Sequence, residues 1–253
     1  MILHAVESGA GPTLVLLHGL FGSARNFGTV QKRLSASFRV LALDLRNHGD
    51  SPHAPGMGYP VQAQDVLATL RAHGALPCAL LGHSMGGKVA MRLALDEPEA
   101  VQRLIVADIA PAPYPPHHHG EIAALAALAL APGMTRAEAD AALAGAIPNA
   151  AVRGFLLQNL CTGPVPSWRL GLREIDAGMA DIEAWPEPPA AAYAGPTLFL
   201  RGERSDYVRE AHRPAIKALF PAARVVTLKG AGHWLHADDF AGFMAAVEAF
   251  LQA

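Results

Sequence analysis

Short runs of apolar residues recur along the chain and are separated by longer segments with helical spacing. The runs cover residues 13–18, 38–45, 78–82, 104–109, 196–201 and 224–228. Each is nearly continuous in apolar residues, as expected of strands that are covered on both faces. Between and after them, apolar side chains recur every three to four positions, which predicts helices over residues 59–73, 85–96 and 240–253. The alternation predicts an α/β fold, with a mostly parallel sheet covered by helices on both faces.

The stretch from residue 112 to residue 193 departs from this pattern because it contains no convincing strand. It opens in PAPYPPHHHG, continues through alanine-rich helical sequence, and closes in WPEPPAAAYAGP. We therefore expect a helical insertion over residues 112–193, with residues 1–111 and 194–253 forming the core. Ligands of open α/β folds bind beyond the carboxyl ends of the strands. An insertion there is well placed to act as a lid that supplies one wall of the pocket.

The composition narrows the class of protein and of partner. The chain has 253 residues, 51% of them hydrophobic and 17% charged, with a net charge of −2, which is typical of one globular domain. This near-neutral balance gives no electrostatic reason to expect nucleic acid or an anionic membrane as the partner. Two cysteines cannot build a disulfide framework or a cysteine-based zinc site. The start of the chain lacks the pattern of a signal peptide, and no apolar run approaches the ~18 residues of a spanning helix, so we expect a cytoplasmic protein.

The segment over residues 78–89, CALLGHSMGGKV, predicts a strand, a sharp turn and a helix. G-x-S-x-G in this context is the pattern of a nucleophile elbow. Side chains two residues before and after the serine would collide at so sharp a turn, which explains Gly82 and Gly86. Ser84 would then lie at a helix N-terminus, where backbone N–H groups can stabilise an oxyanion. The alternative is a glycine-rich turn with a helix-capping serine, but the flanking strand and helix favour the nucleophile.

The segment HGLFGS follows the first core strand and is a candidate for the rest of an oxyanion hole. Its histidine-glycine turn lets the backbone bend beside the elbow. The N–H of Leu20 would join the N–H of Met85 as a pair of donors, with Phe21 as the neighbouring alternative to Leu20. A plain strand-to-helix loop with a packed histidine is the competing interpretation.

Twelve histidines are candidates for the base that a serine nucleophile needs. His233 lies in GAGHW after the last predicted strand, on a glycine loop that allows a close approach, and the order serine, acid, histidine suits this fold. His236 more often packs or lines the pocket, and His83 diverges from the adjacent serine. Residues 117–119 are three consecutive histidines on a proline-rich loop, which fits an exposed loop better than a metal site. We expect substrate contacts from His83, Phe21 and Trp234.

Two aspartates compete for the third member of a triad. Asp206 follows the strand after the insertion, and Asp108 ends the strand before it. Both precede His233 and both lie at carboxyl ends of strands, so either could reach the imidazole, and we give Asp206 a slight preference. In the segment DLRNHGDS, Asp44 and Arg46 are expected to hold the loop beneath the site.

The motifs HGLFGS, DLRNHGDS, GHSMGG, DIAP and GAGHW occur in this order over almost the whole chain. Together they resemble the α/β-hydrolase superfamily, and GHSMGGK, DIAP and GHWLH resemble a branch of small bacterial carboxylesterases and acyl-thioesterases with mitochondrial relatives. The resemblance implies a cap between the sixth and seventh strands, a Ser-His-Asp triad and no cofactor. It assigns Ser84 as nucleophile and His233 as base. For the acid, the superfamily position matches Asp206, whereas branch members lacking an acid there rely on the DIAP aspartate, here Asp108.

These parts predict a serine carboxylesterase that hydrolyses short-to-medium acyl esters, or thioesters, through an acyl-enzyme. We expect a small-molecule acyl ester as the partner, no metal, and a monomer or homodimer. Three alternatives stay open. The first is cofactor-free perhydrolysis or acyl transfer by the same groups, and the second is carbon–carbon bond hydrolysis or a lyase reaction. The third is a ligand-binding protein that kept the fold without turnover.

Overall fold

All six expected strands form in the computed structural model, which describes residues 1–186 and 192–253. A seventh strand joins them in one sheet of order β1-β3-β2-β4-β5-β8-β9. Its members are β1 (Ala5–Ser8), β2 (Thr13–Leu17), β3 (Arg39–Leu43), β4 (Cys78–His83), β5 (Val101–Ala107), β8 (Thr197–Gly202) and β9 (Ala223–Leu228). Every pairing is parallel except that of β1 with β3. The expected fold class is therefore confirmed.

Strand β1 is not predicted by the apolar pattern, for a physical reason. It has four residues, AVES, at the edge of the sheet, and none of them is fully buried. The central strands β2, β4 and β5 are buried over most of their length. A short edge strand has no need of the continuous apolar run that identifies the others.

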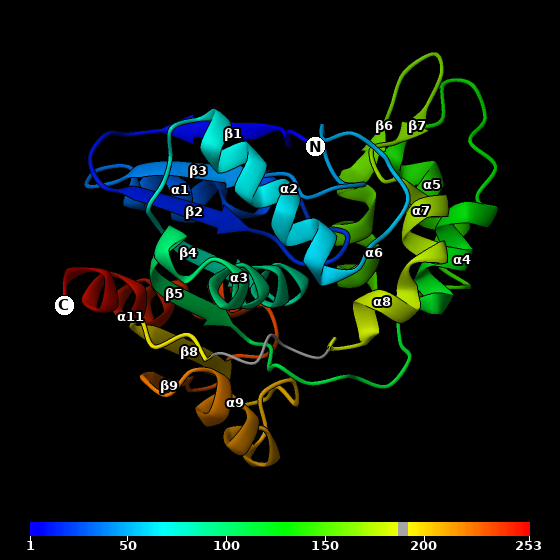
Figure 1. The fold of residues 1–253 in the computed structure, drawn as a ribbon. Helices are drawn as coiled ribbons and strands as arrows, with labels where there is room; N and C mark the ends of the chain where they lie inside the picture. Colours follow the sequence, from blue (N-terminus) through cyan, green and yellow to red (C-terminus); the bar gives the residue numbers. More distant parts are fainter. Residues whose placement is uncertain (187–191) are drawn as a thin grey trace.

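Helices cover both faces of the sheet (Figure 1). Helices α2 (Tyr59–Ala72), α3 (Met85–Asp96) and α9 (Arg213–Leu219) contribute to the larger hydrophobic core, and α1 (Gly28–Leu34) and α11 (Phe240–Gln252) to the smaller core on the opposite face. Shorter helical elements are η1 (Ala24–Phe27), η2 (Pro98–Ala100), η3 (Leu157–Asn159), η4 (Glu210–His212) and α10 (Leu235–Asp238). The sheet is thereby held between two apolar layers, and its strand ends are left to position functional groups.

The inserted segment lies between β5 and β8 and gathers beside the carboxyl ends of the parallel strands, in green to yellow in Figure 1. It contains α4 (His119–Ala127), α5 (Arg136–Leu143), α6 (Ala150–Leu156), α7 (Leu172–Ala177) and α8 (Met179–Glu183). Helix α5 begins at a capping box, in which the Thr135 hydroxyl accepts from the Glu138 amide and the Glu138 carboxylate accepts from the Thr135 amide.

Two expectations about this segment need correction. It contains an antiparallel pair of strands, β6 (Leu160–Cys161) and β7 (Ser167–Trp168), which are too short to produce a periodic pattern. Five strands of the sheet, and not six, precede the insertion in chain order, because β1 is the only strand before β2. The proline-rich stretch at residues 187–191 lies outside the described residues. Among those described, no helix is both long and apolar enough to cross a lipid bilayer.

Candidate active site

Ser84 occupies a strained turn between β4 and α3. Its φ is +52° and its ψ is −121°, in a region that residues with a side chain rarely adopt. A methyl group on Gly82 would collide with the Gly86 carbonyl oxygen, and one on Gly86 would collide with the Leu17 carbonyl oxygen. The two glycines are therefore required by sterics, as the sequence motif predicted. Ser84 itself is half-buried and lines the cavities beside it.

The loop after β2 passes directly against the serine. A methyl group built on Gly19 would lie 3.2 Å from the Ser84 Cβ atom. The next two amides differ, because the N–H of Phe21 donates to His48 Nε2 at 3.1 Å, whereas the N–H of Leu20 has no acceptor among the described residues. The N–H of Met85 begins helix α3 and likewise has no recorded acceptor in the described part of the chain. Leu20 and Met85 therefore offer free donors beside Ser84, and Phe21 does not.

His48 can accept this hydrogen bond because it remains neutral. Its Nδ1–H donates to the Arg46 carbonyl at 2.8 Å, which leaves Nε2 as the acceptor. Burial, and after it the neighbouring His18, lower the pKa of His48 to about 3. The His18 ring is buried as well and accepts from the Leu45 amide at 2.9 Å. A pair of neutral histidines thus fixes the backbone of the loop that carries Leu20.

The structure brings His233 against Asp108 and not against Asp206. The Nδ1–H of His233 donates to Asp108 Oδ2 at 2.7 Å. Asp108 is fully buried and also accepts from the Gly202 amide at 2.9 Å and from the Ser205 hydroxyl. Asp206 is exposed. The slight preference for Asp206 therefore finds no support in the geometry, because this carboxyl lies beyond the end of β8 and on the solvent side.

Two further rings hold the His233 loop. Nε2–H of His83 donates to the His233 carbonyl at 2.8 Å, and burial keeps the pKa of His83 well below its usual value. The Tyr207 ring stacks on the His233 imidazole with their centroids 4.1 Å apart. The Tyr207 hydroxyl lies 2.6 Å from His117 Nε2. The imidazole is thereby oriented through its ring face, its own backbone and its Nδ1 atom.

The remaining candidate histidines lie around the pocket. Burial lowers the pKa of His236 to about 4, and its ring packs 5.1 Å from that of Phe27. Among the three consecutive histidines, His117 and His118 are half-buried and line the site, and His119 is exposed. The expectation of an exposed loop therefore holds for His119 alone, because the inserted segment folds this loop back over Ser84.

A cavity of about 680 Å³ opens beside Ser84 and His233. This volume is within the range of cavities that hold small-molecule ligands. The three side chains expected to contact substrate, Phe21, His83 and Trp234, all line it. Helix α6 of the inserted segment closes one side of the cavity with Val152, Phe155 and Leu156. The pocket is thus built jointly by strand-end loops and by the insertion.

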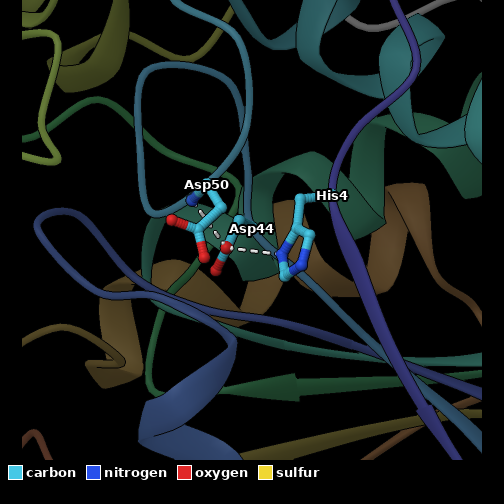
Figure 2. Close-up of side chains that lie close together, drawn as sticks. All are labelled: His4, Asp44 and Asp50. Atoms are coloured by element: carbon cyan, nitrogen blue, oxygen red, sulfur yellow. Dashed lines mark hydrogen bonds and ion pairs between the residues drawn. The ribbon is translucent and has the colours of Figure 1, made fainter.

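Within residues 1–186 and 192–253, one group of side chains has the atom types and spacing to share a metal ion: His4, Asp44 and Asp50 (Figure 2). The Asp44 carboxylate already accepts from His4 Nδ1 and the Asp50 amide through Oδ2, both at 2.9 Å, and from the Ala24 amide through Oδ1 at 2.7 Å. Burial raises the pKa of Asp44, but the Asp50 and Ala24 amides outweigh it and the net shift is downward. Asp44 thus holds its loop, as expected.

Comparison with known proteins gives these features a family. Residues 12–240 match the family model described as the alpha/beta hydrolase fold. The chain belongs to the α/β-hydrolase family. This hydrolase is 43% identical to the mouse (Mus musculus) protein "sn-1-specific diacylglycerol lipase ABHD11", over 95% of this chain and 81% of that one. It is 36% identical to "Esterase YbfF" of Escherichia coli, over 94% of this chain and 92% of that one.

A solved structure titled "Marine microorganism esterase" is similar over 98% of this hydrolase and 99% of that chain, with a TM-score of 0.95 and 36% identity.

Several side chains that shape the site of this hydrolase are not predicted by its sequence. Tyr207, which stacks on His233, and Asn159, which donates to the Phe21 carbonyl, belong to no motif. Lys88, which donates to the Ala184 carbonyl, and His48 lie inside motifs whose pattern points to other residues. A stacking or anchoring role depends on contacts between distant segments, which a sequence pattern does not contain.

Proposed function

We propose that this hydrolase is a serine carboxylesterase that works through Ser84, His233 and Asp108. The observation that carries the proposal is the 2.7 Å hydrogen bond from His233 to the buried Asp108, in a cavity that Ser84 also lines. The amides of Leu20 and Met85 have no recorded acceptor among the described residues, which supports their role as oxyanion donors. The family relationship to proteins named as esterases and a lipase supports the same reaction class.

In this mechanism the Ser84 hydroxyl attacks the carbonyl carbon of an ester, and His233 Nε2 takes its proton. The carbonyl oxygen becomes an oxyanion, which the Leu20 and Met85 amides stabilise. Asp108 stabilises the imidazolium that forms. The carbon–oxygen bond to the alcohol then breaks, and His233 returns the proton to that oxygen. A water molecule attacks the acyl-enzyme by the same route, giving a carboxylic acid and free Ser84.

We further propose that residues 112–193 act as a cap on a core formed by residues 1–111 and 194–253. The wall that α6 adds to the large cavity supports this division. Most of the side chains it adds there are apolar, among them Val152, Phe155 and Leu156. Such a wall suits small-molecule esters, or thioesters, with an apolar group beside the bond that is cleaved better than polyanionic substrates.

The test is hydrolysis of p-nitrophenyl butyrate by the wild type, Ser84→Ala and Ser37→Ala, prepared identically. Ser37 is an exposed serine and serves as the matched control. Loss of the nucleophile should lower kcat by at least about 10⁴-fold, and Ser37→Ala should match the wild type. A fluorophosphonate probe should label the wild type and Ser37→Ala but not Ser84→Ala. Equal activity in Ser84→Ala and the wild type would overturn the proposal.

A further inference from the structure

Two cavities of unequal size meet at Ser84. The larger has a volume of about 680 Å³. The smaller, of about 40 Å³, extends from Ser84 over the start of helix α3 toward the end of the inserted segment. Leu20, Ser84, His118 and Tyr207 line both cavities. An ester bound at Ser84 therefore has two spaces of very different capacity for its two halves.

The position of His233 distinguishes these spaces. His233 and the adjacent Trp234 line the large cavity but not the small one. In acyl transfer the histidine must hand its proton to the oxygen of the leaving group. The leaving group has to lie within reach of that imidazole, so the large cavity is the space that receives it.

The acyl chain takes the direction that remains at the reacting carbon. That carbon bears the Ser84 oxygen, the oxyanion, the leaving group and the acyl chain. The oxyanion faces the amides of Leu20 and Met85, and the leaving group faces His233. The small cavity is lined by Met85 and Ile109 but not by His233, and it is the space left for the acyl chain.

The size and lining of the small cavity limit what can enter it. Its main apolar walls are Ile109, Met179 and Ile182, all of which are buried. An apolar cavity of about 150 Å³ holds a benzene molecule. A space of about 40 Å³, roughly a quarter of that volume, therefore has room for a methyl or ethyl group and not for a longer alkyl chain.

The far wall of the small cavity is fixed by Lys88, one helical turn after Ser84. Its ammonium donates to the Ala184 carbonyl at 2.8 Å and lies 5.2 Å and 4.8 Å from the ring centroids of Tyr59 and Tyr114. The Tyr59 hydroxyl donates to the Ile182 carbonyl at 2.5 Å. Lengthening the cavity would require these buried contacts to break, so the wall resists a longer acyl chain.

We infer that the small cavity is the acyl site, and that this hydrolase acts on esters or thioesters of two- or three-carbon acids with a large apolar leaving group. The inference rests on the proposed function, since it assumes that Ser84 is acylated. It states that the enzyme selects its substrates by the length of the acyl group. Met179 and Ile109 are then the side chains that set the limit.

Two series of esters test the inference. In the first, p-nitrophenyl acetate, butyrate and octanoate keep the leaving group constant, and kcat/KM should fall at least about tenfold from acetate to octanoate. In the second, ethyl, hexyl and decyl acetate keep the acyl group constant, and kcat/KM should rise with the length of the alcohol. The opposite order in either series would overturn the assignment of the cavities.

Paired variants sharpen the test. Met179→Ala enlarges the small cavity and should raise the octanoate-to-acetate ratio of kcat/KM about tenfold. Phe155→Ala enlarges the large cavity and should leave that ratio unchanged while it lowers the preference for decyl over ethyl acetate. Ile109→Val is a milder substitution in the small cavity and should move the acyl ratio in the same direction as Met179→Ala. A Met179→Ala effect confined to the alcohol series would reverse the assignment.

The failure of the inference can be told apart from the failure of the proposed function. Absence of turnover in both series, together with no labelling of Ser84 by a fluorophosphonate, would contradict the proposed function. Turnover that is abolished by Ser84→Ala but fastest with octanoate would contradict the acyl site alone. Labelling of each variant by the probe also reports that its site is folded.

Discussion

The strand-end loops and the inserted segment build opposite walls of one pocket in different ways. Ser84 and Asp108 follow the neighbouring strands β4 and β5, and both have a positive φ of +52°. Such conformations persist only where the surroundings enforce them. The inserted segment is made of short helices and a two-residue strand pair, and its tip exposes 85% of Val165. The groups that we propose to react follow strands of the sheet, whereas most groups that the insertion adds to the pocket lie on short helices.

A few buried contacts fasten the two regions together. The Asn159 side chain donates to the Phe21 carbonyl at 2.8 Å, so the insertion helps to hold the loop that carries Leu20. Lys88 and Tyr59 donate to carbonyl groups near the end of α8. We therefore expect substitutions in the loops at the strand ends to affect rate and stability. Substitutions in the insertion should affect mainly selectivity.

The largest expected effect concerns the acid. Asp108→Asn should lower kcat about 10⁴-fold, because an amide favours the wrong tautomer of His233. Asp206→Asn is the matched control and should stay within about twofold of the wild type, since Asp206 is exposed. Both are measured with p-nitrophenyl butyrate. Similar mild losses in the two variants would remove Asp108 from the mechanism.

Substitutions at two glycines, one in each region, show how differently the two regions respond in the free energy of unfolding. Gly86→Ala should lower the free energy of unfolding by about 4 kcal/mol or more, because the new methyl group meets the Leu17 and His18 carbonyl oxygens. Gly154 lies inside α6, and a methyl group added there would meet nothing within 4 Å outside the backbone of that helix, so Gly154→Ala should stabilise by up to about 1 kcal/mol. Urea unfolding measures both. A destabilised Gly154→Ala would show that α6 is packed as tightly as the elbow.

His48, the neutral histidine that accepts from the Phe21 amide, should make stability depend on pH. The pKa of His48 is about 3 in the folded chain, against 6.5 for an ordinary histidine. Between these values the unfolded chain binds more protons, so the free energy of unfolding falls as the pH is lowered, by up to about 1.4 kcal/mol per pH unit for each such group. Urea unfolding at pH 7.5 and pH 5 measures the slope, and His48→Asn should reduce it. An unchanged slope in that variant would contradict the assignment.

The smallest expected effect is at the tip of the insertion. Val165→Ser should change the free energy of unfolding by less than about 0.5 kcal/mol and leave kcat/KM for p-nitrophenyl butyrate unchanged, since 85% of Val165 is exposed. A clear loss of activity would mean that the tip takes part in substrate binding, and the comparison of the regions would then have to be redrawn.

The sequence was sufficient for the parts of the molecule that obey local rules. Buried strands produce continuous apolar runs, and the elbow requires Gly82 and Gly86 whatever the rest of the chain does. The choice between Asp108 and Asp206 was beyond such rules, because both follow strands of the same sheet. It depends on the backbone at Asp108, whose φ of +52° accompanies a carboxylate turned toward the His233 loop. The two cavities depend on contacts across the insertion, which have no local pattern.

The two ends of the insertion have a consequence for protein engineering. The chain leaves the sheet after β5 and returns at β8, and these strands are hydrogen-bonded neighbours in parallel register, with Leu104 opposite Thr197 and Ala107 opposite Leu200. The intervening segment is therefore an insertion whose two ends are fixed, side by side, by neighbouring strands of the sheet. Segments from other members of the family could be exchanged at these ends to recombine one catalytic scaffold with many pocket shapes, provided that each brings its own partners for Lys88 and Phe21.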